Sequence, residues 1–384
     1  MFFYWFQRNL NNKNISKHLG VKCFTNNKFG YVKMNKKILA LAVAALTTST
    51  YSNAIEVVND GTNTFSVGGR LAASAQFSDG DSQLKNQSSR INFAFTHALD
   101  NGWDVGAKAE WGYDALANSS EGSHLSNRLG QITADKEGIG QFTIGKAWSV
   151  HYDVAGKTDL FWVFGGDTAG NYDGITGDGG AHGTGRADDV IQYRGNFAGL
   201  QIGLQYQFED DNYNETTGKG YNRKGGYQGM LGYDFDFGLG LSGAYSETQF
   251  DDRENAKIGN IVANYQYEGL YLAANYSQAR NHQYQDDYGL TGADVTSNGA
   301  IKKATGVEVF GSYDIGNFQL LGGYNQLSDD NSDAKYAYAT LGAAYFTGPI
   351  ILAAEYKIDT SSKNGNGSSA ELDDVLALLV RYNF

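Results

Sequence analysis

The sequence predicts an all-β protein: a transmembrane antiparallel β-barrel whose long third extracellular loop folds into the lumen. Three observations lead to this prediction. Apolar and polar side chains alternate in segments of about ten residues almost everywhere after residue 60. The connections alternate between tight turns and long acidic loops, which is the pattern of an outer-membrane barrel. The alternation stops over residues 150–187, where ten glycines occur between Gly156 and Gly185 in the longest connection of the chain. A long loop without regular structure inside a regular β protein is usually functional, so we expect it to narrow the barrel.

The first 54 residues look like a leader that precedes the barrel. Residues 1–33 lack alternation, and we expect them to be an over-extended N-terminus, with a genuine N-terminal extension as the alternative. Residues 34–54 have a charged start, nine apolar residues and then small residues, as in a secretory signal peptide. Nine apolar residues are too few to span a bilayer, which needs roughly 20. We expect cleavage between Ala54 and Ile55, which leaves the barrel as residues 55–384.

The composition of the remaining chain suits a closed sheet. The only cysteine, Cys23, lies in the leader, so we expect no disulfide to stabilise the exported protein. The leader holds eight Lys or Arg and no acidic residue, so its removal takes the net charge from −12 to −20. This acidity argues against nucleic-acid binding. One proline and 26 tyrosines in the whole chain favour long, uninterrupted strands.

Side chains on opposite faces of a strand alternate with a period of two, which locates each strand. In the segment 270–276, for example, Leu270, Leu272, Ala274 and Tyr276 share one face. Counting such segments predicts 16 strands, at residues 64–77, 88–97, 103–114, 126–134, 141–149, 188–197, 200–209, 225–235, 239–249, 258–267, 270–280, 305–314, 317–327, 335–346, 350–359 and 373–384.

A soluble β-sandwich is the alternative for any set of alternating strands. Two features favour the barrel. Aromatic residues cluster at strand ends, as in an interfacial girdle. The apolar face of the last strand also runs from Leu376 to the terminal Phe384. A barrel leaves no free edge in lipid, where an unpaired strand edge is not tolerated.

Five motifs stand out: Asn118-Ser-Ser-Glu-Gly122, Tyr152-Asp-Val-Ala-Gly-Lys-Thr-Asp159, Phe164-Gly-Gly-Asp-Thr168, Tyr193-Arg194 and the terminal Phe384. Through them the chain resembles the general, non-specific trimeric porins of Gram-negative outer membranes, the OmpF and OmpC type. The resemblance implies an outer-membrane channel for passive diffusion of ions and small hydrophilic solutes. It also implies a homotrimer that meets lipid, lipopolysaccharide and the barrel-assembly machinery. In that family, acidic residues on the third loop face a ladder of basic residues on the wall.

Strand parity supports the basic side of this constriction. Arg70, Arg90, Arg128 and Arg194 each fall opposite the apolar face of their strand and should point into the lumen. The resemblance implies Glu110, Asp159 and Asp167 as the opposing carboxylates. Tyr152, Trp162 and Val163 should make the constriction more apolar, because Val163 stands where the family usually has a second loop carboxylate.

The resemblance also implies contacts for assembly. Glu121 matches a glutamate that latches into the neighbouring subunit, and its implied partners match Lys146, whose parity is outward, and Arg194. Phe384 matches the terminal aromatic residue that serves as an assembly signal.

Other functions are less well supported. The histidines are scattered and show no triad spacing, so we expect no enzyme and no cofactor. The Gly-Asp-rich stretch 165–180 lacks the spacing of a calcium loop, so we expect no metal site. A receptor would need a plug domain before the first strand. A sugar-specific channel, with Trp148, Tyr152, Phe161 and Trp162 as an aromatic track, stays open, as does an adhesin that uses the acidic loops. For the diffusion pore we expect a weak preference for cations.

Overall fold

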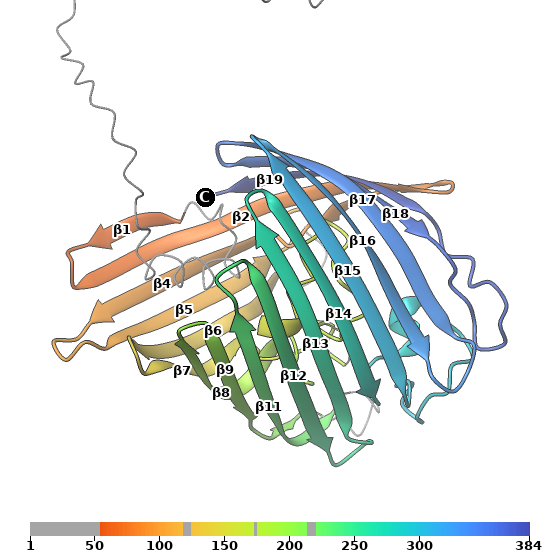
Figure 1. Cartoon of the computed structure of the whole chain (residues 1–384), viewed down its shortest axis with the longest axis horizontal. Coiled ribbons are helices and arrows are strands. Elements are labelled where there is room, and N and C mark those ends of the chain that lie inside the picture. The colour runs from red at the N-terminus through yellow and green to blue at the C-terminus, as the bar shows by residue number, and fades with distance from the viewer. Residues whose placement is uncertain (1–53, 118–123, 173–174, 213–219) are drawn as a thin grey trace, which may run out of the picture. The chain divides into compact units, whose positions relative to one another are not determined.

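The computed structural model describes residues 54–117, 124–172, 175–212 and 220–384. The predicted signal peptide and the segment before it lie outside these residues, apart from Ala54, and so does Glu121. In the described part, the chain forms one antiparallel sheet of 19 strands, of which 16 are long enough to build the barrel wall (Figure 1).

The bounds of the elements agree closely with the predicted segments. The wall strands are β2 (Asn63–Ser78), β4 (Arg90–Ala98), β5 (Asp104–Tyr113), β6 (Leu125–Lys136), β7 (Gly140–Trp148), β8 (Arg186–Phe197), β9 (Leu200–Gln207), β11 (Asn222–Asp234), β12 (Leu239–Phe250), β13 (Ala256–Tyr267), β14 (Leu270–Arg280), β15 (Ala304–Ile315), β16 (Phe318–Asp329), β17 (Lys335–Thr347), β18 (Ile350–Asp359) and β19 (Val375–Asn383). Three short strands accompany them: β1 (Ile55–Asn59), β3 (Asp81–Asn86) and β10 (Asp210–Asp211). The helical elements are one turn each, α2 (Tyr152–Ala155) and η1 (Gln285–Tyr288).

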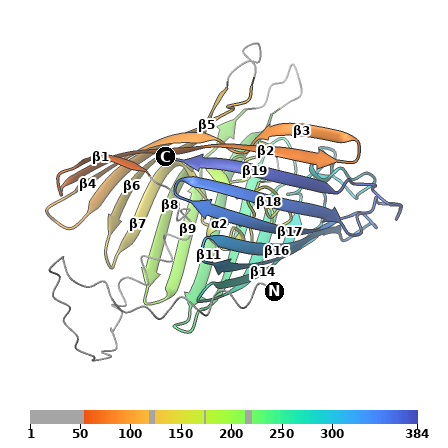
Figure 2. The ribbon, with the colours of Figure 1, turned by 90° about the horizontal axis from the view of Figure 1, so that it is seen from above.

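The sheet closes because the last strand pairs with the first long strand. Along β2, the segment from Arg70 to Phe77 pairs with β19 (Figure 2). Phe384 exchanges two backbone hydrogen bonds with Gly69, of 2.8 and 3.0 Å. Ile55 of β1 pairs with Val67 of β2. β1 therefore continues the line of β19 along one edge of β2. The predicted closed barrel of 16 strands is confirmed.

The two faces of the wall differ as the alternation predicts. On β13, Ile261 is 71% exposed whereas its neighbour Val262 is fully buried. On β14, Leu272 and Tyr276 are exposed on the outer face, and Asn275 and Ser277 are buried on the inner face. An apolar outer face suits contact with lipid. No helix in the described residues has the length and apolarity required to cross a membrane.

The buried core lies inside the barrel, where loops pack against the inner wall. Val154 of α2 packs with Ala244 and Val262 of the wall. A second cluster of wall residues packs against Trp162 and Val163, from the connection between β7 and β8. These apolar contacts therefore hold the connection between β7 and β8 in place inside the barrel.

Candidate functional site

The connection between β7 and β8, residues 149–185, is called L3 here. It folds into the lumen, as the sequence predicts, because its polar groups find partners on inward-facing wall residues. At its start, the backbone N–H of His151 donates to Gln228 Oε1 at 3.2 Å, and His151 Nε2 lies 2.7 Å from Asn260 Oδ1. Further along, Tyr271 Oη donates to the carbonyl oxygen of Lys157 at 2.9 Å.

Two wall glutamates accept most of the hydrogen bonds from the middle of L3. Glu308 of β15 accepts the backbone N–H groups of Thr168 and Ala169, at 2.7 and 2.8 Å, and the hydroxyl of Thr158. Glu355 of β18 accepts three consecutive N–H groups, those of residues 162, 163 and 164, at 2.5, 2.9 and 2.9 Å. Neither glutamate was predicted from the sequence. Parity could have found them, since each lies opposite the apolar outer face of its strand.

Arginine side chains gather on another part of the inner wall, on β2, β4 and β6. Glu110 of β5 accepts Arg128 Nε at 2.8 Å and lies 3.4 Å from Arg90 Nη1. Arg70 Nε donates to the carbonyl oxygen of Ser88 at 3.0 Å. The structure therefore brings Arg70, Arg90, Arg128 and Glu110 together on one part of the inner wall.

Two further arginines, Arg381 and Arg186, join this group, and neither was predicted from the sequence. Arg381 lies on β19, next to β2, and it acts electrostatically on both Arg70 and Arg90. Arg186, the first residue of β8, lies close enough to Arg128 to be repelled by it. Arg381 lies between two outward residues, so parity could have identified it.

Arg194 does not join the group, contrary to the prediction. Its Nε donates to Asp153 Oδ2 of α2 at 2.6 Å, and its Nη2 donates to the carbonyl oxygen of Trp148 at 2.8 Å. The pair ties the first turn of L3 to β8. The cause is local: α2 places an acidic residue directly over the strand that carries Arg194.

The two L3 carboxylates that were predicted to face the arginines, Asp159 and Asp167, also depart from the prediction, because tyrosine hydroxyls bind them instead. Asp159 Oδ2 accepts the hydroxyls of Tyr152 and Tyr172, at 2.8 and 2.6 Å, and its Oδ1 accepts the N–H of Gly166 at 3.1 Å. Burial raises the pKa of Asp159 to about 6, although these hydrogen bonds oppose the rise.

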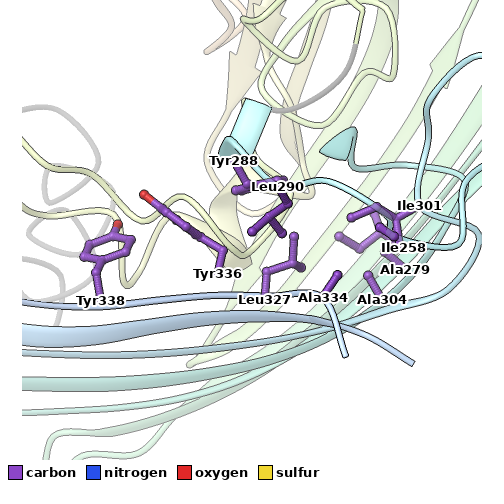
Figure 3. Packing of buried hydrophobic residues seen from close by; sticks show 11 residues of the cluster. Ile258, Ala279, Tyr288, Leu290, Ile301, Ala304, Leu327, Ala334, Tyr336 and Tyr338 are labelled. Atoms are coloured by element: carbon purple, nitrogen blue, oxygen red, sulfur yellow. The ribbon is translucent and has the colours of Figure 1, made fainter. Parts of the chain in front are cut away.

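Asp167 points to a different part of the wall. Its Oδ2 accepts the hydroxyl of Tyr338 at 3.2 Å, and its carbonyl oxygen accepts the hydroxyl of Tyr288 at 3.1 Å. Burial raises the pKa of Asp167, and the nearby charge of Lys357 opposes this rise. Figure 3 shows Tyr338 and Tyr336 rising from one strand and Tyr288 on the segment above them. Tyrosine hydroxyls thus bind the carboxylates of both Asp159 and Asp167.

The predicted apolar residues fix L3 to the wall. Tyr152 stacks on Trp148, with ring centroids 4.3 Å apart. Trp162 packs on Phe346 at 5.6 Å, and its Nε1 donates to Gln319 Oε1 at 3.0 Å. Val163 packs against the same wall cluster as Trp162. Of these three residues, Tyr152 is the one that contacts a predicted carboxylate of L3, that of Asp159.

Lys146 has an inward contact that its parity did not predict. Its Nζ donates to Asp178 of L3 at 3.0 Å and also binds Asp188. A register shift between Gly145 and Ala147 interrupts the ladder with β8 at this point and ends the simple alternation. Asp178 thus serves an ion pair within the Gly-Asp-rich stretch. In the described residues, no group of three His, Cys, Asp or Glu side chains could hold a metal ion.

Comparison with known proteins agrees with this architecture. A family model described as Gram-negative porin matches residues 40–382. Outer membrane porin N of Escherichia coli (strain K12) is 28% identical, over 91% of this chain and 100% of that protein. Salmonella typhi OmpF in complex with daunomycin has a TM-score of 0.71 at 21% identity, over 86% of this chain and 100% of that chain. The trimer form of OmpT from Vibrio cholerae has a TM-score of 0.60 at 16% identity, over 84% of this chain and 100% of that chain.

The matching family and relatives are outer-membrane porins, which confirms the predicted outer-membrane location and transport function and agrees with the prediction that the chain is not an enzyme. The chain belongs to the Gram-negative porin family.

Proposed function

We propose that this chain is a general diffusion porin whose narrowest section lies between L3 and the arginines of the facing wall. The observation that carries the proposal is the attachment of L3 inside the lumen by Glu308 and Glu355. A loop held by several charge-assisted hydrogen bonds stays within the lumen and limits the size of the solutes that pass.

The aromatic residues of L3 argue against a sugar-specific channel. Phe161 packs edge-on against Phe310 of the wall at 4.9 Å, and Trp162 packs against Phe346. Rings used in this way do not offer a continuous track for stacking sugars. We therefore expect the flux of neutral sugars to rise linearly with their concentration.

We propose a homotrimer, by analogy with the trimer form of OmpT. An aromatic patch on β2, β4 and β5 suits a subunit contact: Phe65 stacks on Phe95 at 4.4 Å, and Phe93 contacts Trp111 at 6.1 Å. The latch between Glu121 and Lys146 remains part of this proposal. Lys146 would have to share its charge with Asp178 and Asp188 of its own chain. Lipid, lipopolysaccharide and the assembly machinery are the remaining proposed partners.

Ion preference follows from two opposing fields. The net charge of −20 expected after removal of the leader attracts cations to the pore mouths at low salt. The arginines attract anions at the narrowest section. The Debye length is about 10 Å at 0.1 M salt and about 3 Å at 1 M, so the mouth effect fades first as salt rises. We propose weak cation preference in dilute salt that turns to anion preference in concentrated salt.

Reversal potentials in planar bilayers test this proposal. Under KCl gradients of constant ratio, the sign of the reversal potential should change as the mean concentration is raised from 0.05 to 1 M. Single channels that fail to form, or sugar flux that saturates, would contradict the general diffusion pore.

A further inference from the structure

Five arginines form a row along one side of the wall, on strands between β19 and β8. In the order of the sheet they are Arg381 on β19, Arg70 on β2, Arg90 on β4, Arg128 on β6 and Arg186 on β8; this set is called the arginine row. Arg70 is repelled by Arg90, Arg381 and Arg128, and Arg90 is repelled by Arg186 as well. Like charges so arranged attract an anion that can contact several of them at once.

The protein neutralises the row only in part. Glu110 serves both Arg90 and Arg128, while Asp178 serves Arg186 at 3.7 Å and must also serve Lys146. In the described part of the chain, Arg70 and Arg381 have no ion-pair partner within 4.0 Å.

Asp159 and Asp167 of L3 do not neutralise the remaining positive charge of the arginine row. Asp159 is held by two tyrosine hydroxyls, and Asp167 by the hydroxyl of Tyr338. The row therefore keeps an excess of positive charge on one side of the lumen.

The guanidinium groups keep hydrogen-bond donors for a ligand. Arg70, Arg128 and Arg381 use their Nε atoms for protein contacts, to Ser88, Glu110 and Asn383. Among the described residues, no acceptor takes a hydrogen bond from their terminal nitrogens, and the buried Arg186 Nε also has no partner.

Aromatic rings restrict both ends of the row. The Arg186 guanidinium lies 5.5 Å from the ring centroid of Trp148, and that of Arg381 lies 5.7 Å from the ring centroid of Trp162. Planar guanidinium groups held in this way can donate pairs of N–H bonds to carboxylate or phosphate oxygens.

We propose that the arginine row is a binding site for small multivalent oxyanions, solutes that carry two or more carboxylate or phosphate charges. Such a solute can span neighbouring guanidinium groups, whereas acetate or chloride meets them one at a time. Transport of these solutes would then saturate, while neutral solutes pass by simple diffusion. The inference rests on the proposed function, because it requires that L3 and the row share one conducting lumen.

Ion-current block in planar bilayers tests the site. Citrate probes carboxylates, pyrophosphate probes phosphates, and acetate at equal ionic strength is the control. We expect citrate, pyrophosphate or both to reduce the single-channel current with a saturable concentration dependence, and acetate to leave it nearly unchanged. Block by only one of the two assigns the row to that oxyanion.

Variants separate binding from general charge. The double variant Arg70→Gln with Arg381→Gln should raise the half-blocking concentration at least tenfold. The double variant Arg70→Lys with Arg381→Lys keeps the charge but loses the paired N–H groups, and should fall between it and the unaltered chain. Arg280→Gln, at an exposed position at the end of β14, is the matched control, and its channel should be blocked at the same anion concentration as the unaltered chain.

Two outcomes would overturn the inference. One is a conducting channel in which citrate, pyrophosphate and acetate act alike. The other is equal block of the unaltered chain and the Arg70→Gln, Arg381→Gln variant. In both cases the channel still conducts, so the diffusion pore stands. A chain that folds but conducts no ions contradicts the proposed function instead.

Discussion

The carboxylate of Glu308 on β15 accepts the backbone N–H of Thr168 in L3 at 2.7 Å. These residues are 140 positions apart in the sequence, and both are buried. The contact joins the middle of L3 to the inner wall, at the point where the loop would otherwise be free to leave the lumen.

Replacing both wall glutamates should release L3. The Glu308→Ala, Glu355→Ala variant leaves at least five backbone N–H donors without their acceptors. Each lost acceptor costs about 1–3 kcal/mol unless water replaces it. We expect larger and more variable single-channel conductance, with the barrel still formed. Glu247→Ala on β12 is the control, since among the described residues its carboxylate binds Tyr227, Tyr245 and Lys257, which all lie on β11 to β13 of the wall. Unchanged conductance in the double variant would mean that L3 is held by other contacts.

Acid should weaken the attachment of L3 through three buried histidines. His151 and His182 lie in L3, and the ring of His182 packs at a tilt against His282, in the loop after β14, with ring centroids 4.5 Å apart. Burial lowers the pKa of His151 from 6.5 to about 4, and burial together with Arg253 and Arg223 lowers that of His182 to about 3. Burial also lowers the pKa of His282.

The sign of this effect follows from proton binding. Below pH 6.5 a released L3 binds more protons at these histidines than an attached one, so the attachment weakens as pH falls from 6.5 toward 3. The raised pKa values of Asp159, about 6 against an ordinary 3.8, and of Asp167 act in the opposite direction. We therefore expect the weakening where the histidines of a released loop take up protons, as the pH falls below 6.5, and these two carboxyls reduce its size.

Conductance recorded between pH 7 and pH 4 measures the effect. We expect increasing current fluctuations as the pH falls, and a flatter response for the His182→Gln variant. His97→Gln, an exposed position on β4, is the control. A pH response that is the same in the unaltered chain and in His182→Gln would refute the role of these histidines.

The wall was predictable from the sequence because lipid and lumen impose opposite requirements on alternate residues. The bounds predicted for β14 and β18, 270–280 and 350–359, match the structure, and the inward direction of Arg70, Arg90 and Glu110 followed from the same alternation. Short strands such as β10, with two residues, carry too little pattern to be recognised.

The contacts of L3 could not be predicted in the same way. The loop has no periodicity, and its partners are far away in sequence, as for Trp162 with Glu355. The directions of Asp159 and Asp167 depend on tyrosines whose positions only the folded barrel defines. Parity gave the wrong direction for Lys146 because the register of the β7–β8 ladder shifts between Gly145 and Ala147.

Charge substitutions at the constriction should move the reversal potential by unequal amounts. Arg128→Ala removes one cation and leaves Glu110 with Arg90 alone, so we expect a shift toward cations and a larger conductance. Asp159→Asn should shift the potential toward anions by less, because two tyrosines already cover its carboxylate. Arg280→Ala is the control for the first variant. If neither substitution changes the reversal potential, ions do not pass between L3 and the arginine row.

Processing should remove the predicted leader. Because Ile55 is the first residue of β1 and pairs with Val67, cleavage after Ala54 would leave β1 intact. We expect N-terminal sequencing of the exported protein to start at Ile55. A mature protein that retains any residue from 1 to 33 would instead support a genuine N-terminal extension.

Deleting Phe384 should impair closure of the barrel. The residue exchanges two backbone hydrogen bonds with Gly69, and its ring lies directly over that glycine. A Cβ added at Gly69 would come within 2.7 Å of the Phe384 ring and 2.5 Å of the Arg90 carbonyl oxygen, so the glycine is needed for this close approach. Phe384 is half-buried, so loss of its ring removes less than the about 1.5–3 kcal/mol that full burial of such a side chain contributes. We therefore expect both the deletion and Gly69→Ala to lower the yield of folded protein, measured by heat-modifiable migration in gels after refolding into detergent. Gly130→Ala, on β6 with open space around it and no positive φ, controls for the loss of a glycine. Full yield from the chain without Phe384 would show that the pairing of β19 with β2 closes the barrel without its terminal residue.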